Sequence, residues 1–474
     1  MDSSTDAVTP ALGRPPAATG APVPLAEPTA SPTPEPRERQ ATGSHSLWRN
    51  RDYVAWLTAD TAWQFGASIR AFAMLLITYA VTGSYIQAGT VSTVSTVASL
   101  VATLPGGVLV DRWDRRLSLT VSGLLRAVVF GAAAVSWWTG TMTLGVLYAV
   151  GVTSGLIGGL FSSASDAALK SVVPATDLPR AVAANQGRDA AVSLAASPIS
   201  GALIAVSYAL PFLAASVGAV LQVIGTHFIR ADLRPPRATV TAAEETARGG
   251  VRTWAHEMAQ GFQVFRDIPV VGRMLPALVL VNGGINGLVA GITLILQGQG
   301  VEPWRIGLLD TAIGIGMLLG ALAASPLISR IPTGRLVTVL FVSITVVLLP
   351  LGVRPTLGVA LVCLSATGVA IPSVNGAMAG YFQARIPDEL QGRALSSLGV
   401  INMSLMALMP AIVGVGLQTL GAGPTMLATA ALLPLAAVTL LTHKSFRALP
   451  TPDRWEGLPS PSPIDEGDPA TVEP

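Results

Sequence analysis

Residues 106–116 read GGVLVDRWDRR and stand between two apolar runs, residues 86–110 and 117–139. Each run has the roughly 20 apolar residues that a helix needs to cross the hydrocarbon core of a membrane. Charged side chains fill the short connection between the runs, and a charge at bilayer depth is energetically expensive. We therefore place the connection in water at a membrane surface, with the two runs crossing the membrane as antiparallel helices.

The composition of the whole chain agrees with a membrane protein. Of the 474 residues, 51% are hydrophobic and 12% are charged, and the mean hydropathy is +0.57. Soluble proteins carry about 25% charged residues, so too little polar surface remains here to coat a globule of this size. The formal net charge of +2 gives no reason to expect nucleic-acid binding. The single cysteine, Cys363, can form neither an internal disulfide nor a Cys-rich metal site.

Twelve apolar runs, each long enough to span a membrane, follow one another along the chain. They lie at about residues 53–81, 86–110, 117–139, 142–166, 181–206, 210–229, 275–297, 305–329, 336–353, 357–381, 394–418 and 423–442. The longest polar interruption divides them six and six. The sequence therefore predicts an all-α, polytopic membrane protein with twelve transmembrane helices in two six-helix pseudo-repeats.

The remaining segments complete the predicted domain organisation. The two six-helix bundles occupy residues 48–229 and 275–443. Between them, residues 230–274 form a cytoplasmic linker, and the apolar residues of its second part recur at helical spacing, which predicts an amphipathic helix on the membrane surface. The tails, residues 1–47 and 444–474, are poor in apolar residues that could form a core, so we expect both to be disordered.

The basic residues predict the orientation of the spans, because Lys and Arg gather in cytoplasmic loops. With both termini inside, the inner flanks and loops hold 22 Lys and Arg residues, whereas the outer loops hold only Arg305 and Arg354. We therefore expect a multi-pass protein of a bacterial inner membrane with both termini in the cytoplasm.

A short internal repeat marks corresponding places in the two halves. Residues 173–181 read VPATDLPRA before the fifth span, and residues 386–394 read IPDELQGRA before the eleventh. In both segments a Pro, five intervening residues and then Arg-Ala follow one another, with the arginines at Arg180 and Arg393. Duplicated halves are typical of secondary transporters, which bind their substrate between the repeats.

The segment at residues 106–116 resembles the G-x-L-x-D-R-x-G-R-R signature of the major facilitator superfamily, with Asp114 in place of the usual Gly. The signature is carried by Gly107, Leu109, Asp111, Arg112, Arg115 and Arg116. Together with TGS (82–84), GLLRA (123–127) and IPDELQGRA, it is similar to the branch of enterobactin exporters and macrolide-efflux proteins. SPISG (197–201) resembles a degenerate antiporter motif whose Pro198 and Gly201 would serve helix packing.

The resemblance implies a conformational latch at this loop. Gly107 would let two helices approach, and Asp111 would accept hydrogen bonds from the N-terminus of the eleventh span near Arg393. That contact would hold the cytoplasmic side shut while the binding site opens outward. The three arginines of the loop would brace it and contact anionic lipid, or they would serve only as topology determinants.

Polar side chains inside the predicted spans are the candidates for a proton or substrate site. The first span holds Asp60, Gln64 and Arg70, and Asp60 lies roughly 12 Å into the span at 1.5 Å per residue. That depth suits a carboxylate that exchanges protons with a central cavity. The alternative is a structural pair of Asp60 with Arg70 or with Arg126 of the third span. Arg126 is itself either a cavity-facing charge or the partner of an acid.

Further candidates lie in later spans. Arg188 and Asp189 are adjacent in the fifth span and point in different directions, so we expect each to pair with another helix. Asp166 and Asp310 lie near span ends, where we expect solvated side chains. The second half offers amides that either line a substrate path or bond only to neighbouring helices: Asn282, Asn286, Asn375 and Asn402.

The sequence contains no enzyme signature, neither an H-E-x-x-H motif nor a P-loop, so we expect no catalysis, no metal and no cofactor. The resemblance implies a secondary active transporter, working as a monomer in the bilayer. It would export a small amphipathic molecule, such as an antibiotic, drug or siderophore, in exchange for protons. The alternatives are an importer or uniporter of the same fold, and a non-transporting membrane receptor or assembly protein.

The latch can be tested at its acid. Asp111→Asn removes the negative charge that the helix N-terminus would attract, so we expect transport to be abolished while the amount of protein in the membrane stays normal. Transport assays on membranes with matched expression measure this. Near-normal transport by the variant would contradict the latch.

Overall fold

The computed structural model describes residues 47–174, 176–234, 269–386 and 388–455, and these residues form helices and no strand. The first set is α1 (Arg51–Thr82), α2 (Tyr85–Arg112), α3 (Arg115–Trp138), α4 (Leu144–Leu160), α5 (Ala164–Val172), α6 (Leu178–Val206) and α7 (Leu210–Phe228). The second set is α9 (Pro269–Gly298), α10 (Pro303–Arg330), α11 (Thr333–Val353), α12 (Leu357–Arg385), α13 (Asp388–Thr419), α14 (Ala422–Ala430) and α15 (Leu432–Thr442). Most of the predicted linker, with its amphipathic helix, and nearly all of the N-terminal tail lie outside the described residues.

Eleven helical segments in the described part of the chain are long and apolar enough to cross a membrane, if α4 with α5 and α14 with α15 are each counted as one. The remaining predicted span corresponds to α2, which is rich in Ser and Thr. Its 28 residues extend about 42 Å at 1.5 Å per residue, which is more than a bilayer core requires. The predicted polytopic, all-α fold is confirmed.

Two of the predicted continuous spans are interrupted. The fourth breaks at residues 161–163, between α4 and α5, and the twelfth breaks at Ala431, between α14 and α15. The first break coincides with polar residues, Ser162, Ser163, Ser165 and Asp166, at the end of the apolar run, whereas the residues around Ala431 are as apolar as the rest of their run. In a membrane protein, irregular backbone is tolerated where it is covered by protein or lines a cavity.

Side-chain caps start four helices of the first set, α1 to α4. Asn50 precedes α1 and accepts from the backbone N–H groups of Asp52 and Tyr53 at 3.0 and 3.2 Å. Asp114, which replaces the Gly of the family signature, precedes α3 and accepts from the N–H of Arg116 at 2.8 Å. Each cap satisfies N–H groups that have no partner within the helix.

Glycines allow close backbone contact between α2 and α4. A Cβ added at Gly155 would lie 2.2 Å from the carbonyl oxygen of Ser95, and one at Gly159 would lie 2.1 Å from that of Ser99. Without a hydrophobic force between helices in lipid, such close packing is what holds them together.

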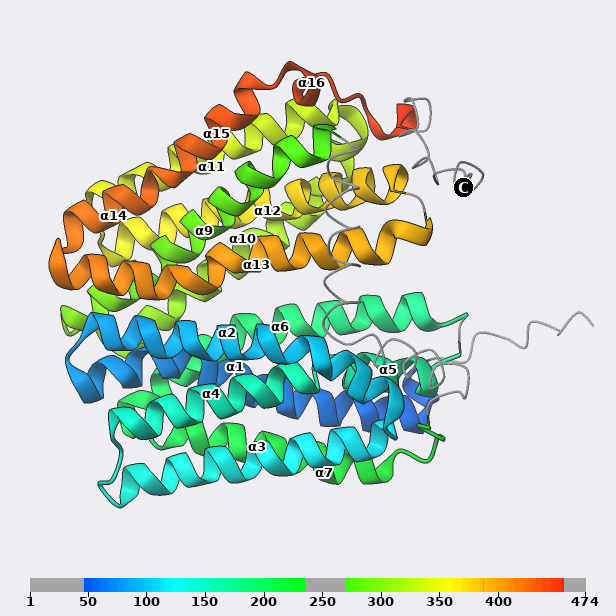
Figure 1. Cartoon of the computed structure of the whole chain (residues 1–474), viewed down its shortest axis with the longest axis vertical. Helices are drawn as coiled ribbons and strands as arrows, with labels where there is room; N and C mark the ends of the chain where they lie inside the picture. Colours follow the sequence, from blue (N-terminus) through cyan, green and yellow to red (C-terminus); the bar gives the residue numbers. More distant parts are fainter. Residues whose placement is uncertain (1–46, 175, 235–268, 387, 456–474) are drawn as a thin grey trace, which may run out of the picture. The chain divides into compact units, whose positions relative to one another are not determined.

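The two helix sets touch through α2 with α13 and through α6 with α10, and Figure 1 shows these helices facing one another. The N–H of Tyr85 donates to Oε1 of Gln418 at 3.1 Å, and the N–H of Ala411 donates to Oγ1 of Thr93 at 3.1 Å. These residues lie in the halves of α2 and α13 that the basic-residue pattern places toward the outside. The described contacts therefore hold the predicted outer ends of the two sets together.

The C-terminal segment is ordered further than expected. Residues 444–455, predicted to be disordered, form the short helix α16 (Lys444–Arg447) and the turn η2 (Pro452–Arg454). Trp455 is only 7% exposed, and its ring lies 5.9 Å from that of Tyr381 in α12. The composition of the tail misleads here, because a few large apolar side chains anchor a Pro-rich segment to the ends of α11 and α12.

The α2–α4 contact predicts a strong effect of one methyl group. Gly159→Ala forces the two backbones apart, and overpacking of this kind destabilises a protein by about 1–3 kcal/mol. We expect a lower melting temperature in detergent and a lower yield of folded protein.

Gly145→Ala is the matched control in the same helix, because a Cβ there meets its nearest atom only at 3.8 Å. Equal melting temperatures for the two variants would show that the close approach is not required for stability.

Candidate functional site

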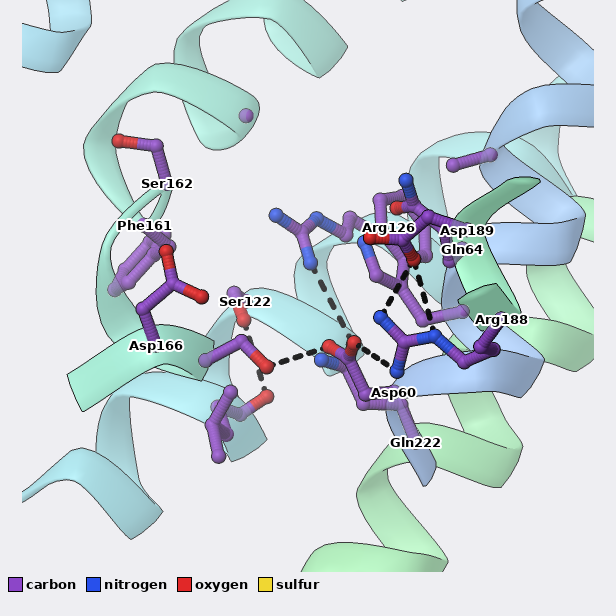
Figure 2. A pocket seen from close by; sticks show the side chains of 15 residues that line it. Asp60, Gln64, Ser122, Arg126, Phe161, Ser162, Asp166, Arg188, Asp189 and Gln222 are labelled. Carbon is purple, nitrogen blue, oxygen red and sulfur yellow. Dashed lines mark hydrogen bonds and ion pairs between the residues drawn. The ribbon is translucent and has the colours of Figure 1, made fainter. Parts of the chain in front are cut away.

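A cavity of about 350 Å³ lies within the first helix set, and charged and amide side chains line much of it (Figure 2). Five of the ten predicted proton or substrate residues lie in its wall: Asp60, Gln64, Arg126, Arg188 and Asp189. They come from α1, α3 and α6, which packing brings together although the residues are far apart in sequence.

Asp60 is held by partners from two other helices. Its Oδ2 lies 2.7 Å from Nη1 of Arg188 in α6, and its Oδ1 accepts from the hydroxyl of Ser165 in α5 at 2.5 Å. The side chains of Asp60 and Arg188 are each 14% exposed. The partner is therefore neither Arg70 nor Arg126, the two alternatives that the sequence suggested. A buried ion pair of this kind is strongly destabilised when one partner is removed.

Arg188 pairs with another helix through Asp60, as expected, but it also binds its neighbour Asp189, which corrects the expectation that Asp189 pairs with another helix. Nε and Nη2 of Arg188 donate to Oδ1 of Asp189 at 3.0 and 2.7 Å. The error arose because Cα–Cβ directions were used for a side chain that is long enough to turn back. The guanidinium is a planar fork, so it contacts Asp189 with one edge and Asp60 with the remaining nitrogen, as Figure 2 shows.

The break between α4 and α5 brings further polar groups to the cavity. Ser162, Ser165 and Asp166 line it, and the backbone carbonyl of Ser165 also accepts from the indole N–H of Trp56 at 3.2 Å. Asp166 is exposed, as predicted, but it faces the cavity mouth. Ser165 was not among the predicted site residues, although Ser162, Ser163 and Ser165 interrupt the apolar run with polar side chains.

Arg126 is a cavity-facing charge, the first of its two predicted alternatives. Its guanidinium carbon lies 3.9 Å from the ring centroid of Trp63, and its Nη1 lies 3.5 Å from Oε1 of Gln222. Gln222, only 2% exposed, is the one amide in the mainly apolar run of α7, a signal that the sequence offered. Arg70 does not line the cavity and lies 5.1 Å from the ring centroid of Phe130.

The predicted amides of the second set lie elsewhere. Asn282 of α9 donates to Oδ1 of Asn402 of α13 at 2.9 Å, and Asn286 donates to the carbonyl oxygen of Asn282 at 3.0 Å. Asn375 of α12 is exposed. The Asn282–Asn402 bond fits the alternative in which the amides bond to neighbouring helices, Asn286 bonds within its own helix, and none of the four lines the 350 Å³ cavity.

The signature loop is braced by the segment that follows α7. Arg116 donates to the carbonyl oxygens of Ile229 and Ala231 at 2.5 and 3.3 Å, and Arg115 donates to the hydroxyl of Ser171. Bracing by these two arginines thus has a direct structural basis. The side chains of Asp111 and Arg393 lie outside the described residues, so the latch itself remains a prediction.

The close approach near this loop falls one residue earlier than expected. A Cβ at Gly107 would meet nothing within 4 Å, whereas one at Gly106 would lie 2.5 Å from the carbonyl oxygen of Leu160. The contact that needs glycine is therefore the packing of α2 on α4, within one helix set. Gly107 is free of close neighbours in this arrangement of the helices.

The SPISG segment of α6 packs against α10. A Cβ at Gly201 would lie 2.4 Å from the carbonyl oxygen of Pro303, which supports the predicted packing role. The hydroxyl of Ser197 lies 2.6 Å from Oδ2 of Asp310. Asp310 was expected to be solvated near a span end. The correction follows from helix packing: α6 covers that end, and the carboxylate bonds across the two sets.

Comparison with known proteins identifies the family. The sequence profile of the Major Facilitator Superfamily matches residues 60–410, which include the cavity residues and the signature loop. The chain belongs to this superfamily of membrane transporters. No curated protein sequence matches it, so the resemblance to the enterobactin and macrolide branch remains a prediction.

Solved structures of transporters share the fold. The bacterial homologue of the iron transporter ferroportin, in an inward-facing state, has a TM-score of 0.60 at 16% identity, with 85% of this chain and 100% of that chain covered. The xylose transporter XylE from E. coli, inward open, has a TM-score of 0.58 at 13% identity, covering 84% and 96%. The nucleoside transporter NupG has 0.58 at 13%, covering 83% and 100%.

The Asp60–Arg188 pair predicts a non-additive effect on stability. Arg188→Gln leaves the carboxylate of Asp60 buried without its cation, and we expect it to lower the free energy of unfolding by about 3 kcal/mol, whereas Asp60→Asn should cost less because Asp189 still binds Arg188. The double variant removes both charges and should lose less than the sum of the two single losses. Thermal unfolding in detergent measures this cycle, and strictly additive losses would show that the pair contributes no coupling.

Proposed function

We propose that the protein exports a small amphipathic molecule, such as an antibiotic, drug or siderophore, in exchange for protons, and that Asp60 carries the proton. The observation that supports this most strongly is the carboxylate of Asp60 in the cavity wall, shared between Arg188 and Ser165. A secondary transporter needs a buried group whose charge state changes the relative energies of two conformations.

Protonation of Asp60 would act on three helices at once. The neutral carboxyl no longer attracts the guanidinium of Arg188, while Asp189 still binds it, so Arg188 is not left unpaired. The bond to Ser165 ties the same carboxyl to α5. A proton therefore weakens the attachment of α1 to α6 without leaving an isolated buried charge, which is the property that a reversible switch requires.

The cavity has the size and the mixed chemistry that an amphipathic molecule requires. Its 350 Å³ falls within the range of about 300–1,000 Å³ that is typical of drug-sized ligands. Trp63, Phe161 and Leu119 supply apolar surface beside the charged groups. Because the cavity lies in the first helix set, substrate and proton would share it, and each would affect the binding of the other.

For the direction of transport and its coupling to protons, there is one specific alternative. XylE is a xylose transporter, and another similar structure is that of a D-xylose-proton symporter, so proton-driven import by the same fold is the second candidate. The SPISG resemblance favours export. A uniporter, or a receptor that transports nothing, would not need a titratable acid in the cavity.

The remaining proposals are the latch at Asp111, a location in the bacterial inner membrane with cytoplasmic termini, and activity as a monomer.

The proton site can be tested with a matched pair of variants. Asp60→Asn removes the proton-accepting carboxylate, so we expect gradient-driven transport to fall to background. Asp166→Asn removes an exposed carboxylate from the same cavity and should retain most of the activity. The measurement is accumulation of a panel of toxic amphiphiles in cells expressing each variant at equal membrane levels.

The same cells test the direction. Export requires that a protonophore raise accumulation in wild-type cells to the level of the Asp60→Asn cells. A protonophore that lowers accumulation would favour the importer, and normal gradient-driven transport by Asp60→Asn would reject Asp60 as the proton carrier.

A further inference from the structure

Arg126 is a buried cation that no described carboxylate neutralises. Its side chain projects from α3 into the cavity wall, and the residue is only 6% exposed. The ion pairs of the described residues use Arg180, Arg188, Arg305 and Arg454, and none of them includes Arg126. A charge at membrane depth is retained only where something compensates it, so the missing partner is itself informative.

The contacts that Arg126 does make leave it incompletely satisfied. Trp63 covers the guanidinium at 3.9 Å, and Gln222 offers one oxygen at 3.5 Å, the limit for a hydrogen bond. Nε is buried without a hydrogen-bond partner. A guanidinium has five N–H donors in a planar fork, so several donors remain for a ligand in the cavity.

A second cation lies behind the first. Trp63 stacks on Phe130 with the rings 6.4 Å apart and inclined by 13°, and Arg70 lies 5.1 Å from the ring centroid of Phe130. Nε of Arg70 is also buried without a hydrogen-bond partner. The row Arg126–Trp63–Phe130–Arg70 therefore carries two positive charges that meet aromatic rings but no described carboxylate.

The acids of the cavity do not cancel this charge. Asp60 is engaged by Arg188 and Ser165, and Asp189 is engaged by Arg188 from the other side. Asp189 is 46% exposed, and Asp166 is exposed too, so water screens both. The buried end of the cavity, beside Arg126, is left positive.

We infer that the substrate is an organic anion and that Arg126 binds its carboxylate or a similar oxyanion. A guanidinium fork matches two oxygens of such a group and is less strongly hydrated than an ammonium, which suits a buried site. The apolar body of the substrate would lie against Leu119 and Phe161. This inference rests on the proposed function, because it names the substrate class of the same cavity.

Matched pairs of probes test the charge of the substrate. The probes are 2-naphthoate, biphenyl-4-carboxylate and anthracene-9-carboxylate, each compared with its primary amide, which has nearly the same shape and no charge. Calorimetric titration into the detergent-solubilised full chain gives each Kd. We expect at least one carboxylate to bind tenfold or more tightly than its amide. A panel in which no carboxylate is preferred overturns the inference.

Variants assign the preference to one residue. Arg126→Gln should remove the carboxylate preference while leaving amide binding unchanged, and Arg126→Lys, which keeps the charge without the fork, should retain part of it. Lys170→Gln removes an exposed positive charge of the same helix set outside the cavity and should change neither. A preference that survives in Arg126→Gln overturns the assignment.

Melting temperature separates binding from structure. Without its ligand, the buried guanidinium of Arg126 lacks a counter-ion and part of its hydrogen bonds. Its removal should therefore not destabilise the protein, and Arg126→Gln should melt at the same temperature as the wild type or higher. If Arg126→Gln and Arg126→Lys both fail to fold, the arginine is a structural element and the inference is wrong. These titrations use no proton gradient. Their result is therefore independent of proton coupling, which the transport assay of Asp60→Asn tests.

Discussion

The ion pair between Asp60 and Arg188 is the interaction on which the first helix set is organised, because lipid offers no solvent for a separated charge. The pair ties α1 to α6, and the hydroxyl of Ser165 adds α5 on the remaining carboxylate oxygen. Asp189 then supplies a second acceptor to the same guanidinium. Four polar groups thus satisfy one another around a cavity, and the break between α4 and α5 supplies one of them. The irregular backbone that hydropathy missed is placed where polar neighbours can accommodate it.

Helix α6 connects this cluster to the boundary between the two sets. Arg188 lies in its first half, while Ser197 and Gly201 lie in its second half and pack against α10. Pro198, which has no backbone N–H, interrupts the hydrogen-bond ladder between the two places. A change in the bonding of Arg188 therefore acts on the same helix that holds the sets together through Ser197 and Asp310. Under the proposed function, α6 would couple a charge change at Arg188 to a change of helix packing at the boundary.

The sequence predicted the spans, the two halves, the family and five of the cavity residues, since these follow from hydropathy, charge and motif. It could not predict which charges meet. Asp60 and Arg188 lie far apart in the chain, and only the packing of α1 on α6 makes them neighbours. The error over Asp189 has a different origin: the backbone directs adjacent side chains apart, but the long side chain of Arg188 turns back to its neighbour. Trp455 shows the reverse case, in which one aromatic residue orders a segment whose composition indicates disorder.

The two helix sets differ in how they tolerate polarity, and this difference bears on how they move. Among the described residues, the second set holds a neutral amide pair, Asn282–Asn402, between α9 and α13, and a carboxylate, Asp310, that bonds to Ser197 of the first set. The charged cluster and the two uncompensated arginines all belong to the first set. Rearranging neutral amides against a neighbouring helix costs far less than exposing a charge to lipid. The neutral amides of the second set can therefore rearrange at less electrostatic cost than the charged cluster of the first set, whereas a shift of α10 against α6 has to break the bond between Asp310 and Ser197. Under the proposed function, a proton or a charged substrate would act on the first set, and the second set would move in response.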